Sequence, residues 1–278
     1  MKVTIFGPGF LGTRLARDVP GATLVRTDIA DEAAVRNALR ETEADAAINC
    51  AAKTGRPNVD WCETHQEETT RTNVVGALTL ARACAAAGAY LLHLGSGCIF
   101  YGDSPSPGGW REDDFANPEG FYSRTKYAAD LVLSRLPHVG IVRLRMPIDG
   151  EPGARNLITK LAAYQQVVDV ANSVTIVDDF VQVVSRLVER RATGVFHAAN
   201  PGTMRHTQLL TLYRELVDPR HECAFISADE LVHRGLAVRA RSNCLLGSTR
   251  LEALGIHMPS IDVSLRRTMM EYAARVRP

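Results

Sequence analysis

The amino-acid sequence predicts an α/β fold, with a doubly wound parallel sheet and a smaller C-terminal lobe. Through the first half of the 278 residues, short apolar runs alternate with amphipathic segments, which is the order of a parallel sheet with helices on both faces. The apolar runs are almost continuous, as in strands covered on both sides. After Pro147, loops rich in Gly, Pro and Asn loosen this pattern, and the change predicts the second lobe.

The first strands and helices follow one another in chain order. Residues 2–6 (KVTIF) predict a buried strand, and after a glycine turn the amphipathic residues 13–19 predict a helix. Residues 22–28 predict a second strand. Residues 31–41 predict a helix because acidic side chains stand at its start, where the helix dipole favours them. Residues 45–52 (DAAINCAA) predict the third strand.

The alternation continues to residue 148. The alanine-rich segment 73–88 predicts a helix that ends at Gly88, and the apolar run 90–100 (YLLHLGSGCIF) predicts a strand. Residues 121–136 predict a helix and residues 140–148 (GIVRLRMPI) another strand. The later predicted elements are helices at 178–191 and 208–216 and one more sheet strand at 194–200.

These elements divide the chain into two parts. We expect residues 1–150, together with about 172–198, to form the sheet domain. We expect about 151–171, together with 199–278, to form the smaller lobe. No repeat or flexible linker separates the parts, so the lobe is expected to pack directly on the sheet.

The composition excludes several classes of protein. The formal net charge of +1 gives no case for binding nucleic acid or a membrane surface. No apolar run approaches the ~20 residues of a transmembrane helix. The N-terminal run is too short and too interrupted by glycine for a signal peptide, so we expect a cytoplasmic protein. The six cysteines and eight histidines lack the spacing of zinc sites, and we expect neither a metal nor a disulfide.

The glycine turn after the first strand predicts a dinucleotide site. GPGFLG places Gly7, Gly9 and Gly12 between the first strand and the first helix. A diphosphate needs a backbone that it can approach closely, and it benefits from the positive end of the following helix. Glycines that serve only a tight turn are the alternative. Further expected cofactor contacts are Phe10 and Leu11 in the turn and Ala51 and Ala52 at the end of the third strand.

The end of the second strand bears on which dinucleotide binds. NAD enzymes usually place an acid there for the ribose 2′-hydroxyl, whereas an arginine suits the 2′-phosphate of NADP. The sequence LVRTD presents Arg26 before Asp28, so we expect NADPH, with NADH as the alternative. Asp28 and Ile29 are expected beside the adenine. A solvated surface charge is the alternative interpretation of Arg26.

Tyr122 and Lys126 predict a reductase. In YSRTK they stand four residues apart on a predicted helix and therefore share a face. A tyrosine with a pKa of about 10 is a poor acid–base group near neutrality, and a lysine charge one turn away lowers that pKa. A surface Tyr–Lys pair is the alternative. The glycine loop, Ser96 at the end of an earlier strand and Asn73 make the combination specific.

With these motifs the sequence resembles the extended short-chain dehydrogenase/reductases along nearly its whole length. The resemblance implies a Rossmann domain in which Ser96 and Tyr122 hydrogen-bond the substrate carbonyl and Tyr122 protonates it. It also implies that Lys126 tunes Tyr122 and holds the nicotinamide ribose, and that Asn73 helps to order the site. Extended members usually show GxxGxxG, which has one more residue between the first two glycines than this chain.

Cys98 suggests a second chemistry. Residues two apart in a strand share a face, so Ser96 and Cys98 are expected to point the same way. A ketone at C4 of a sugar acidifies the protons on C3 and C5, and inversion there needs a base on one face of the ring and a donor on the other. A thiol with a pKa of about 8.5 can donate that proton. Lys160 is the candidate base, provided that burial or a nearby cation lowers its pKa. A packing cysteine and a solvated lysine are the alternative.

Several segments resemble a narrower group, the bifunctional epimerase/reductases that make nucleotide-linked rhamnose in plants. This resemblance implies a UDP- or dTDP-linked 4-keto-6-deoxyglucose as substrate, NADPH as cofactor, and Cys98 and Lys160 as epimerase acid and base. The loop between Cys98 and Tyr122 departs from the plant pattern and is expected to cover the sugar. The segments are residues 54–63, 71–81, 97–100, 143–148, 155–160 and 241–243.

Five polar residues are candidate substrate contacts. Arg56 and Asn58 belong to the loop that follows the third strand, at the ligand-binding edge of the sheet. Arg241 and Asn243 stand where extended family members often contact the substrate diphosphate, which a guanidinium can grip with two hydrogen bonds. Asn156 is a weaker candidate. A surface ion pair is the alternative for each arginine.

Three functions remain open at this stage. The first is combined 3,5-epimerisation and 4-reduction, and the second is 4-reduction alone, as in dTDP-4-dehydrorhamnose reductase. The third is a non-catalytic dinucleotide-binding partner, because the regulatory subunit of methionine adenosyltransferase resembles these reductases. The complete set of Ser96, Tyr122 and Lys126 favours turnover. The resemblance also implies a homodimer that pairs through helices near residues 66–88 and 122–135.

Overall fold

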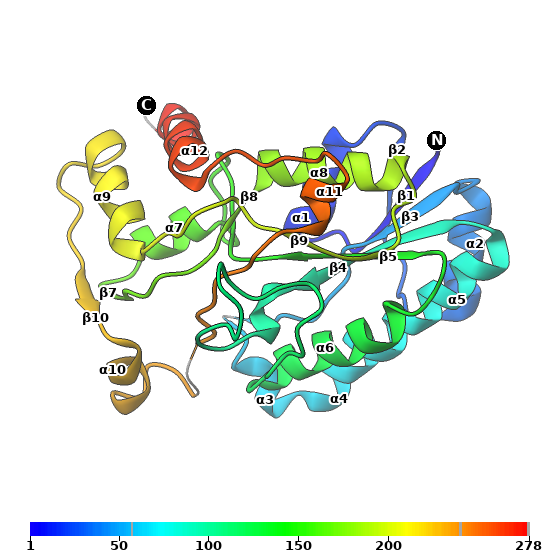
Figure 1. Cartoon of the computed structure of the whole chain (residues 1–278), viewed down its shortest axis with the longest axis horizontal. Coiled ribbons are helices and arrows are strands. Elements are labelled where there is room, and N and C mark those ends of the chain that lie inside the picture. Colours follow the sequence, from blue (N-terminus) through cyan, green and yellow to red (C-terminus); the bar gives the residue numbers. More distant parts are fainter. Residues whose placement is uncertain (57, 239–240, 277–278) are drawn as a thin grey trace.

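A parallel sheet forms the centre of the structure, a computed structural model that describes residues 1–56, 58–238 and 241–276 (Figure 1). Within these residues the sheet has six strands, in the order β2-β1-β3-β4-β5-β9. This arrangement confirms the predicted fold class. The strands are β1 (Val3–Phe6), β2 (Ala22–Val25), β3 (Ala46–Asn49), β4 (Tyr90–Ser96), β5 (Val139–Leu144) and β9 (Gly194–Ala198).

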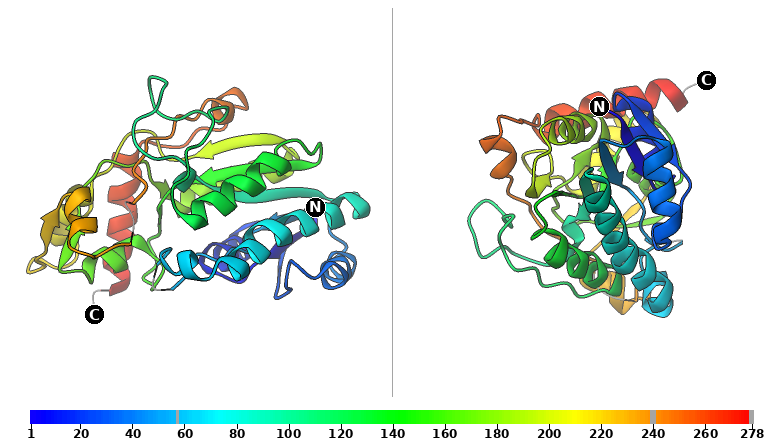
Figure 2. Two further views of the ribbon diagram at one scale, coloured as in Figure 1. Left: turned by 90° about the horizontal axis from the view of Figure 1, so that it is seen from below. Right: turned by 90° about the vertical axis from the view of Figure 1, so that its right-hand side faces the viewer.

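Helices cover both faces of the sheet, as the views in Figure 2 show. On one face, α1 (Phe10–Asp18) and α8 (Val177–Glu189) bury Leu15 and Phe180 against the strands. On the other face, α2 (Glu32–Glu41), α5 (Ala77–Ala87) and α6 (Phe121–Leu133) pack a second apolar cluster. The inner strands β1, β3, β4 and β5 therefore bury both of their faces, which explains their nearly continuous apolar runs in the sequence. The edge strand β2 is only partly buried.

The direction of winding reverses between β1 and β3. β2 pairs with one side of β1, and the chain then crosses back so that β3 pairs with the other side. In doubly wound sheets, ligands bind at the carboxyl ends of the strands beside such a reversal. The fold therefore places the glycine turn after β1 and the loop after β3 next to each other at the predicted cofactor site.

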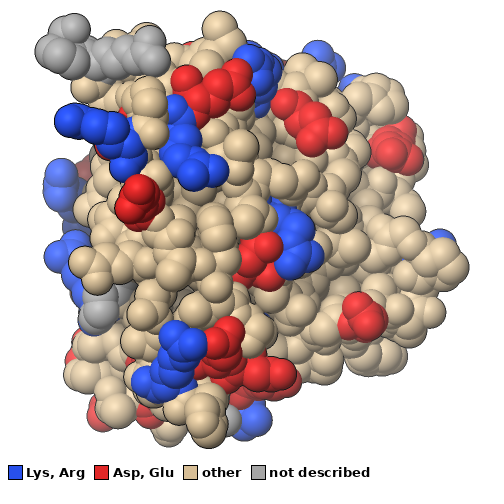
Figure 3. Space-filling view, turned by 90° about the vertical axis from the view of Figure 1, so that its left-hand side faces the viewer, with Lys and Arg blue, Asp and Glu red and all other residues tan. Residues whose placement is uncertain are grey.

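A smaller lobe lies beside the sheet, at the left of Figure 1. Its core contains Ile158, Leu209 and Met269. On the face of this lobe seen in Figure 3, acidic and basic side chains lie interspersed, as the net charge of +1 leads one to expect. Its elements are β6 (Pro147–Ile148), α7 (Leu157–Ala162), β7 (Gln166–Val168), β8 (Thr175–Ile176), α9 (His206–Leu216), β10 (Ala224–Ile226), α10 (Ala228–His233) and α12 (Ile261–Val276).

Several element boundaries differ from the sequence predictions. The strand predicted at 90–100 ends at Ser96 and is followed by the short 3-10 helix η2 (Gly97–Ile99). The strand predicted at 140–148 is divided into β5 and β6, and Met146 between them has a φ of +43°. The helix predicted at 73–88 begins earlier, as a helical stretch with a π-helical turn. The other elements are α3 (Trp61–Thr64), α4 (Gln66–Thr70), the π-helix η1 (Arg71–Gly76) and α11 (Arg250–Ala253).

Among the described residues, no helix is both long and apolar enough to span a membrane. In the same part of the chain, no group of His, Cys, Asp and Glu is arranged to hold a metal ion. All six cysteines are free thiols.

Candidate active site

The glycine turn after β1 has the shape of a diphosphate cradle. Gly7 has a φ of +98°, and a Cβ there would lie 2.3 Å from Ala51 N. A Cβ on Gly12 would lie 1.9 Å from the Gly7 carbonyl oxygen. The fold itself therefore requires these two glycines. Gly9 differs, because a Cβ there would meet no atom of the described chain within 4 Å. The open space in front of Gly9 is where a bound diphosphate would approach the backbone.

Helix α1 begins at this open space. Its N-cap is Gly9, and within the described chain no side chain caps the helix. The first-turn N–H groups are therefore available to an anion. The side chains of Phe10 and Leu11 are partly buried against the sheet core, so these residues anchor the turn. The residues present fit the diphosphate of a dinucleotide.

Arg26 and Asp28 follow the end of β2, and Arg71 of η1 reaches Asp28. Arg26 is exposed, and within the described residues it has no ion pair. Asp28 accepts a hydrogen bond from Ala30 N. It also forms an ion pair with Arg71, with 2.8 Å between Asp28 Oδ2 and Arg71 Nη1. Both contacts lower the pKa of Asp28. Arg71, which the sequence did not single out, therefore adds positive charge to this edge.

The prediction for Ile29 is wrong. Its side chain is 1% exposed and belongs to the core beneath η1. A Cβ on Gly76 would lie 2.6 Å from Ile29 Cγ1, so this packing is close. Ile29 is therefore covered by protein and is not available to stack on an adenine.

Asn73 joins the loop after β3 to α6. Its Oδ1 accepts from Lys53 N at 2.8 Å, and its Nδ2 donates to Thr125 Oγ1 at 3.1 Å. The π-helical turn η1 carries this residue, and such turns often occur at functional sites. The loop begins with Ala51, whose N–H donates to Asn49 Oδ1, and with the exposed Ala52. Asn73 thus holds the cofactor edge of β3 against the helix that carries Tyr122 and Lys126.

Ser96, Cys98 and Tyr122 form a cluster at the carboxyl end of β4, which is the candidate reactive centre. The sequence predicts Ser96 and Cys98 on one face of a strand, but Cys98 lies in η2. They are held together differently, because Ser96 Oγ accepts a hydrogen bond from Cys98 N at 3.1 Å. A side-chain hydrogen bond also joins Ser96 to Tyr122. The thiol of Cys98 accepts from Arg145 Nη1 at 2.8 Å.

The expected effect of Lys126 on Tyr122 differs in the structure. Burial raises the pKa of Tyr122, the nearby Cys98 thiol adds to the rise, and the hydrogen bond with Ser96 opposes it. Lys126 Nζ is directed elsewhere. It donates to the Leu94 carbonyl at 2.8 Å and lies 3.0 Å from His93 Nε2.

The buried contacts of Lys126 define its proton state. Asn49 Oδ1 accepts from Ala51 N, so the Asn49 amide nitrogen donates to His93 Nδ1 at 3.0 Å. Burial and the nearby positive charge of Lys126 lower the pKa of His93 well below 6.5, so the imidazole is neutral near pH 7. Burial also lowers the pKa of Lys126, to about 8. The ammonium form of Lys126 therefore still predominates at pH 7, but the side chain can exchange a proton near neutral pH.

Lys160 meets the condition that the sequence argument set for a base. It lies on α7 and is half-buried. Burial and the positive charge of Arg155 both lower its pKa. Arg155 in turn donates to Thr54 Oγ1 at 3.0 Å and to the Gly55 carbonyl. These contacts tie the start of α7 to the loop after β3.

Two of the five predicted substrate contacts, Arg241 and Asn156, each make several side-chain contacts within the protein. Arg241 makes a bidentate ion pair with Asp60 at 2.6 and 2.8 Å, which lowers the pKa of Asp60. Asn156 is fully buried, and its amide accepts from Ile158 N and donates to the carbonyls of Asp149 and Glu151. It caps α7 and so orients the helix of Lys160. The predicted substrate contact of Asn156 is therefore wrong.

The other three candidates, Arg56, Asn58 and Asn243, lie on loops. Arg56 is exposed, and within the described residues it has no ion pair. Asn58 Oδ1 accepts from Asp60 N at 2.8 Å and shapes its own loop. Asn243 is half-buried, and its carbonyl accepts from Gly102 N at 2.9 Å.

Glu63 supports the helix of Tyr122. Its Oε1 accepts from Phe121 N at 2.7 Å, at the start of α6. Because the N-cap of α6 is Gly120, with no capping side chain of its own in the described structure, this carboxylate supplies the cap from a distant loop. Local sequence patterns did not reveal Glu63, since its partner lies 58 residues away.

The loop between Cys98 and Tyr122 is anchored on the C-terminal segment. Trp110 stacks on Phe100 with ring centroids 4.7 Å apart, and Trp110 N donates to the Leu245 carbonyl. Buried Glu112 accepts from Thr249 Oγ1 at 3.0 Å. The loop therefore has a fixed base beside the reactive centre.

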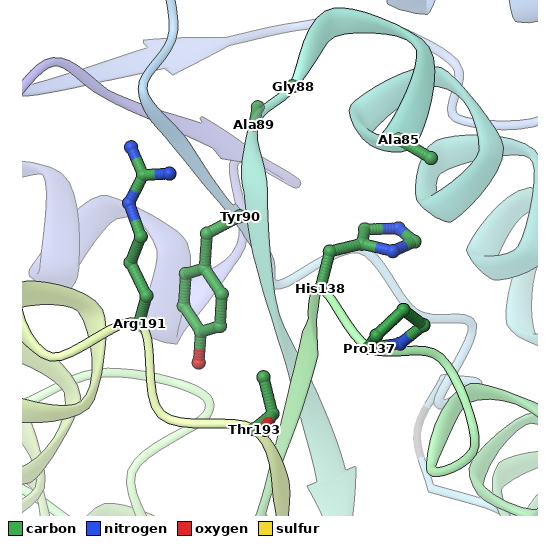
Figure 4. Close-up of a pocket in the computed structure, with 8 residues that line it drawn as sticks. All are labelled: Ala85, Gly88, Ala89, Tyr90, Pro137, His138, Arg191 and Thr193. Carbon is green, nitrogen blue, oxygen red and sulfur yellow. The ribbon is translucent and has the colours of Figure 1, made fainter.

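A cavity at the other edge of the sheet is separate from this centre (Figure 4). It is lined by Tyr90 at the start of β4 and by Arg191 and Thr193 before β9. Tyr90 Oη donates to the Ala192 carbonyl at 2.6 Å. Because β4 begins at the cavity and ends at Ser96, the cavity has no part in the chemistry described above.

Comparisons with known proteins agree with this geometry. A family model described as RmlD substrate binding domain matches residues 1–273. A bifunctional dTDP-4-dehydrorhamnose 3,5-epimerase/dTDP-4-dehydrorhamnose reductase of Arabidopsis thaliana is 40% identical over 81% of this chain and 76% of that protein. A trifunctional dehydratase/epimerase/reductase of the same plant, acting on UDP-sugars by its name, is 33% identical over 98% of the chain, which spans 42% of its length.

A solved structure is also similar. The UDP-rhamnose synthase of Acanthamoeba polyphaga mimivirus superposes with a TM-score of 0.89 at 28% identity. The match covers 98% of this chain and 99% of the viral protein.

Proposed function

Because the chain belongs to the RmlD substrate-binding-domain family, we propose that it is an NADPH-dependent 3,5-epimerase/4-reductase. It converts a UDP- or dTDP-linked 4-keto-6-deoxyglucose to the nucleotide-linked L-rhamnose. The observation that carries the proposal is the thiol of Cys98 beside Ser96 and Tyr122. Reduction of a ketone uses the serine and the tyrosine but needs no thiol, whereas inversion at C3 and C5 does need a proton donor.

Epimerisation precedes reduction in this proposal. The C4 carbonyl acidifies the protons on C3 and C5 of the sugar. Lys160, whose pKa is lowered by burial and by Arg155, removes a proton from one face as a neutral amine. Cys98 returns a proton to the same carbon from the other face.

Reduction then uses the residues at the ends of β4 and α6. NADPH, when bound, supplies the hydride. Ser96 and Tyr122 hydrogen-bond the C4 oxygen, and Tyr122 gives it a proton as the alkoxide forms. Because burial raises the pKa of Tyr122, the hydroxyl is fully protonated at neutral pH and is suited to act as the acid. Lys126 holds the nicotinamide ribose, and Asn73 fixes the loop and helix that meet there.

Loops at the carboxyl edge of the sheet supply the remaining contacts in this proposal. Gly7, Gly9 and Gly12 hold the diphosphate of the cofactor, and Arg26 binds its 2′-phosphate. Arg56, Asn58, Arg241 and Asn243 contact the sugar nucleotide. Two copies pair through the helical segments at residues 66–88 (α4, η1 and α5) and 122–135 (α6). The exposed apolar side chains of Val75 on η1 and of Leu131 and Val132 on α6 support this proposal.

Product analysis in heavy water tests the function. The protein is incubated in D₂O with NADPH and UDP- or dTDP-4-keto-6-deoxyglucose, and the product is examined by NMR. We expect nucleotide-linked L-rhamnose with deuterium at C3 and C5. Product formed only from sugar that another enzyme has already epimerised would reduce the function to 4-reduction. Tight binding of NADP without oxidation of NADPH by any 4-keto sugar nucleotide would instead favour the regulatory role.

Removal of the Arg26 side chain is expected to weaken the binding of NADPH more than the binding of NADH. A hydrogen bond to a charged group contributes about 1.5–3 kcal/mol, so Arg26→Ala should raise the Kd of NADPH roughly 10- to 100-fold. The Kd of NADH, which lacks the 2′-phosphate, should change less than about threefold. Calorimetric titration measures both constants.

Arg40→Ala serves as the matched control for Arg26. Arg40 is an exposed arginine of α2 that donates only to Asn37 among the described contacts, and its loss should leave both constants unchanged. Equal weakening of NADPH and NADH in Arg26→Ala would show that Arg26 does not read the 2′-phosphate.

A further inference from the structure

Arg145 is a buried cation that the reaction described so far does not use. Its side chain follows β5, is 3% exposed, and forms no ion pair with a carboxylate among the described residues. One guanidinium nitrogen, Nη2, donates to Asn172 Oδ1 at 2.7 Å and to the Ser242 carbonyl. The other, Nη1, donates to Cys98 Sγ at 2.8 Å. A buried charge without a counter-ion is costly, so this arrangement calls for an explanation.

The surroundings of the thiol indicate where the counter-ion forms. Tyr122, Tyr101 and Cys244 also face Cys98, and burial raises the pKa of each of them. All three are therefore neutral near pH 7. Among the described residues around the thiol, the charge comes from Arg145.

The chain makes room for this contact. A Cβ on Gly97 would lie 2.7 Å from Leu246 Cδ1 and 3.3 Å from Arg145 Cδ, so a side chain there would collide with the leucine and crowd the arginine. Arg145 Nε is buried and has no hydrogen-bond partner in the described structure. The guanidinium thus keeps one N–H donor that no protein group in the described structure uses.

We propose that Arg145 is the positioning residue that makes Cys98 a proton donor for epimerisation. Arg145 orients Sγ and balances the thiolate that remains after the donation. In that step the S–H bond breaks and a C–H bond forms at C3 or C5. The electron pair of the S–H bond stays on sulfur, and the enolate collapses to restore the C4 carbonyl. The base on the other face, Lys160, holds the proton that it removed earlier. It then releases that proton to solvent, and the Cys98 thiolate takes one up from solvent.

This inference rests on the proposed epimerase function, but its main test does not need the sugar. Iodoacetamide reacts with thiolates, and mass spectrometry of the Cys98 peptide measures the rate. In Arg145→Met we expect alkylation of Cys98 at pH 7 to slow about 10- to 100-fold, with the pH profile moved to higher pH. Arg145→Lys, which keeps the charge but not the planar fork, should restore part of the rate.

A matched control separates this role from a structural one. Asn172 binds Arg145 and Cys244 N but does not contact Cys98 in the described structure, so Asn172→Ala disturbs the packing of Arg145 while keeping its charge. We expect alkylation of Cys98 in Asn172→Ala to stay within about threefold of the unaltered protein. Circular dichroism and Tm confirm that each variant is folded.

The activity readout is a ratio. In Arg145→Met, deuterium incorporation at C3 and C5 should fall at least tenfold relative to oxidation of NADPH. An alkylation profile in Arg145→Met that coincides with that of the unaltered protein would overturn the proposal, as would an equal slowing in Asn172→Ala. Failure of the epimerase function itself would be seen separately, as absence of deuterium in the product of the unaltered protein.

Discussion

Cys98→Ala should lose about 10²- to 10⁴-fold of the rate at which deuterium enters C3 and C5, the range that a positioned acid or base contributes. The thiol is the donor that the proposed inversion needs, and alanine leaves the second face of the sugar without one. Reduction of sugar that is already epimerised should fall far less, because Ser96 and Tyr122 act on the C4 oxygen. NMR of the product and absorbance of NADPH measure the two rates.

Lys160→Met should reduce the rate of deuterium incorporation at C3 and C5 by a similar factor, because it removes the base that takes the proton from the first face of the sugar. The lysine acts as a neutral amine, so the rate of deuterium incorporation should rise with pH and level off once the amine is deprotonated. Because burial and Arg155 lower the pKa of Lys160, the midpoint of this rise should lie below the ordinary value of 10.5. Arg155→Met removes one of the two causes and should move the midpoint to higher pH.

Two variants control for the loss of any thiol or amine. Cys223 is a partly buried cysteine of the smaller lobe, and Lys2 is an exposed lysine before β1. Cys223→Ala and Lys2→Met should leave both rates within about twofold. If deuterium incorporation in Cys98→Ala matched that of Cys223→Ala, Cys98 would be a packing residue.

The order of strands and helices could be predicted because the inner strands of the sheet are covered on both sides. The apolar runs and the intervening amphipathic segments locate five of the six sheet strands in the first half of the chain. The ends of elements were harder to predict. The run 90–100 is apolar throughout, and only the hydrogen bond from Cys98 N to Ser96 Oγ shows where the chain leaves the strand. The strands of the smaller lobe have only two or three residues, and their pairings join segments that are distant in the sequence.

The candidate reactive groups stand out in the sequence because they follow local spacings. Tyr122 and Lys126 are one helical turn apart, and Ser96 and Cys98 are neighbours at the end of one strand. The residues that hold them could not be found in this way, because their partners are remote in sequence. His93 lies 33 residues from Lys126, and Arg145 lies 47 residues from Cys98. One local signal was available, namely polar side chains within otherwise apolar strands, as at His93, Arg143 and His197.

Arg143 shows what such a polar side chain does. It is 4% exposed on β5, and its Nε pairs with Asp130 Oδ2 at 2.9 Å, beneath the helix that carries Tyr122. The Arg143 guanidinium also lies over the Phe100 ring, with its carbon 5.5 Å from the ring centroid. A Cβ on Gly95 would lie 2.9 Å from Arg143 Cγ, so the glycine in β4 admits the arginine.

Loss of either partner should destabilise the protein strongly. Arg143→Met removes the cation that pairs directly with the buried Asp130 carboxylate, and breaking a buried pair in this way costs about 3–5 kcal/mol. For a chain of this size that loss corresponds to a fall in Tm of roughly 6–20 °C. Urea unfolding measures the free energy, and Asp130→Asn should give a loss of the same order because it leaves the arginine unpaired.

The double variant separates the cost of an unpaired charge from the value of the pair. In Arg143→Met/Asp130→Leu both charges are gone, so it should be more stable than either single variant, since apolar replacement of a buried pair is often close to neutral. Arg36→Met is the surface control, because Arg36 pairs with Glu32 on α2 where both side chains are well exposed; its effect should stay within about 0.5 kcal/mol. A double variant as unstable as the sum of the single ones would mean that Arg143 and Asp130 stabilise the sheet separately. The penalty would then come from lost packing around Phe100 and Gly95, and α6 would not depend on the ion pair for its position.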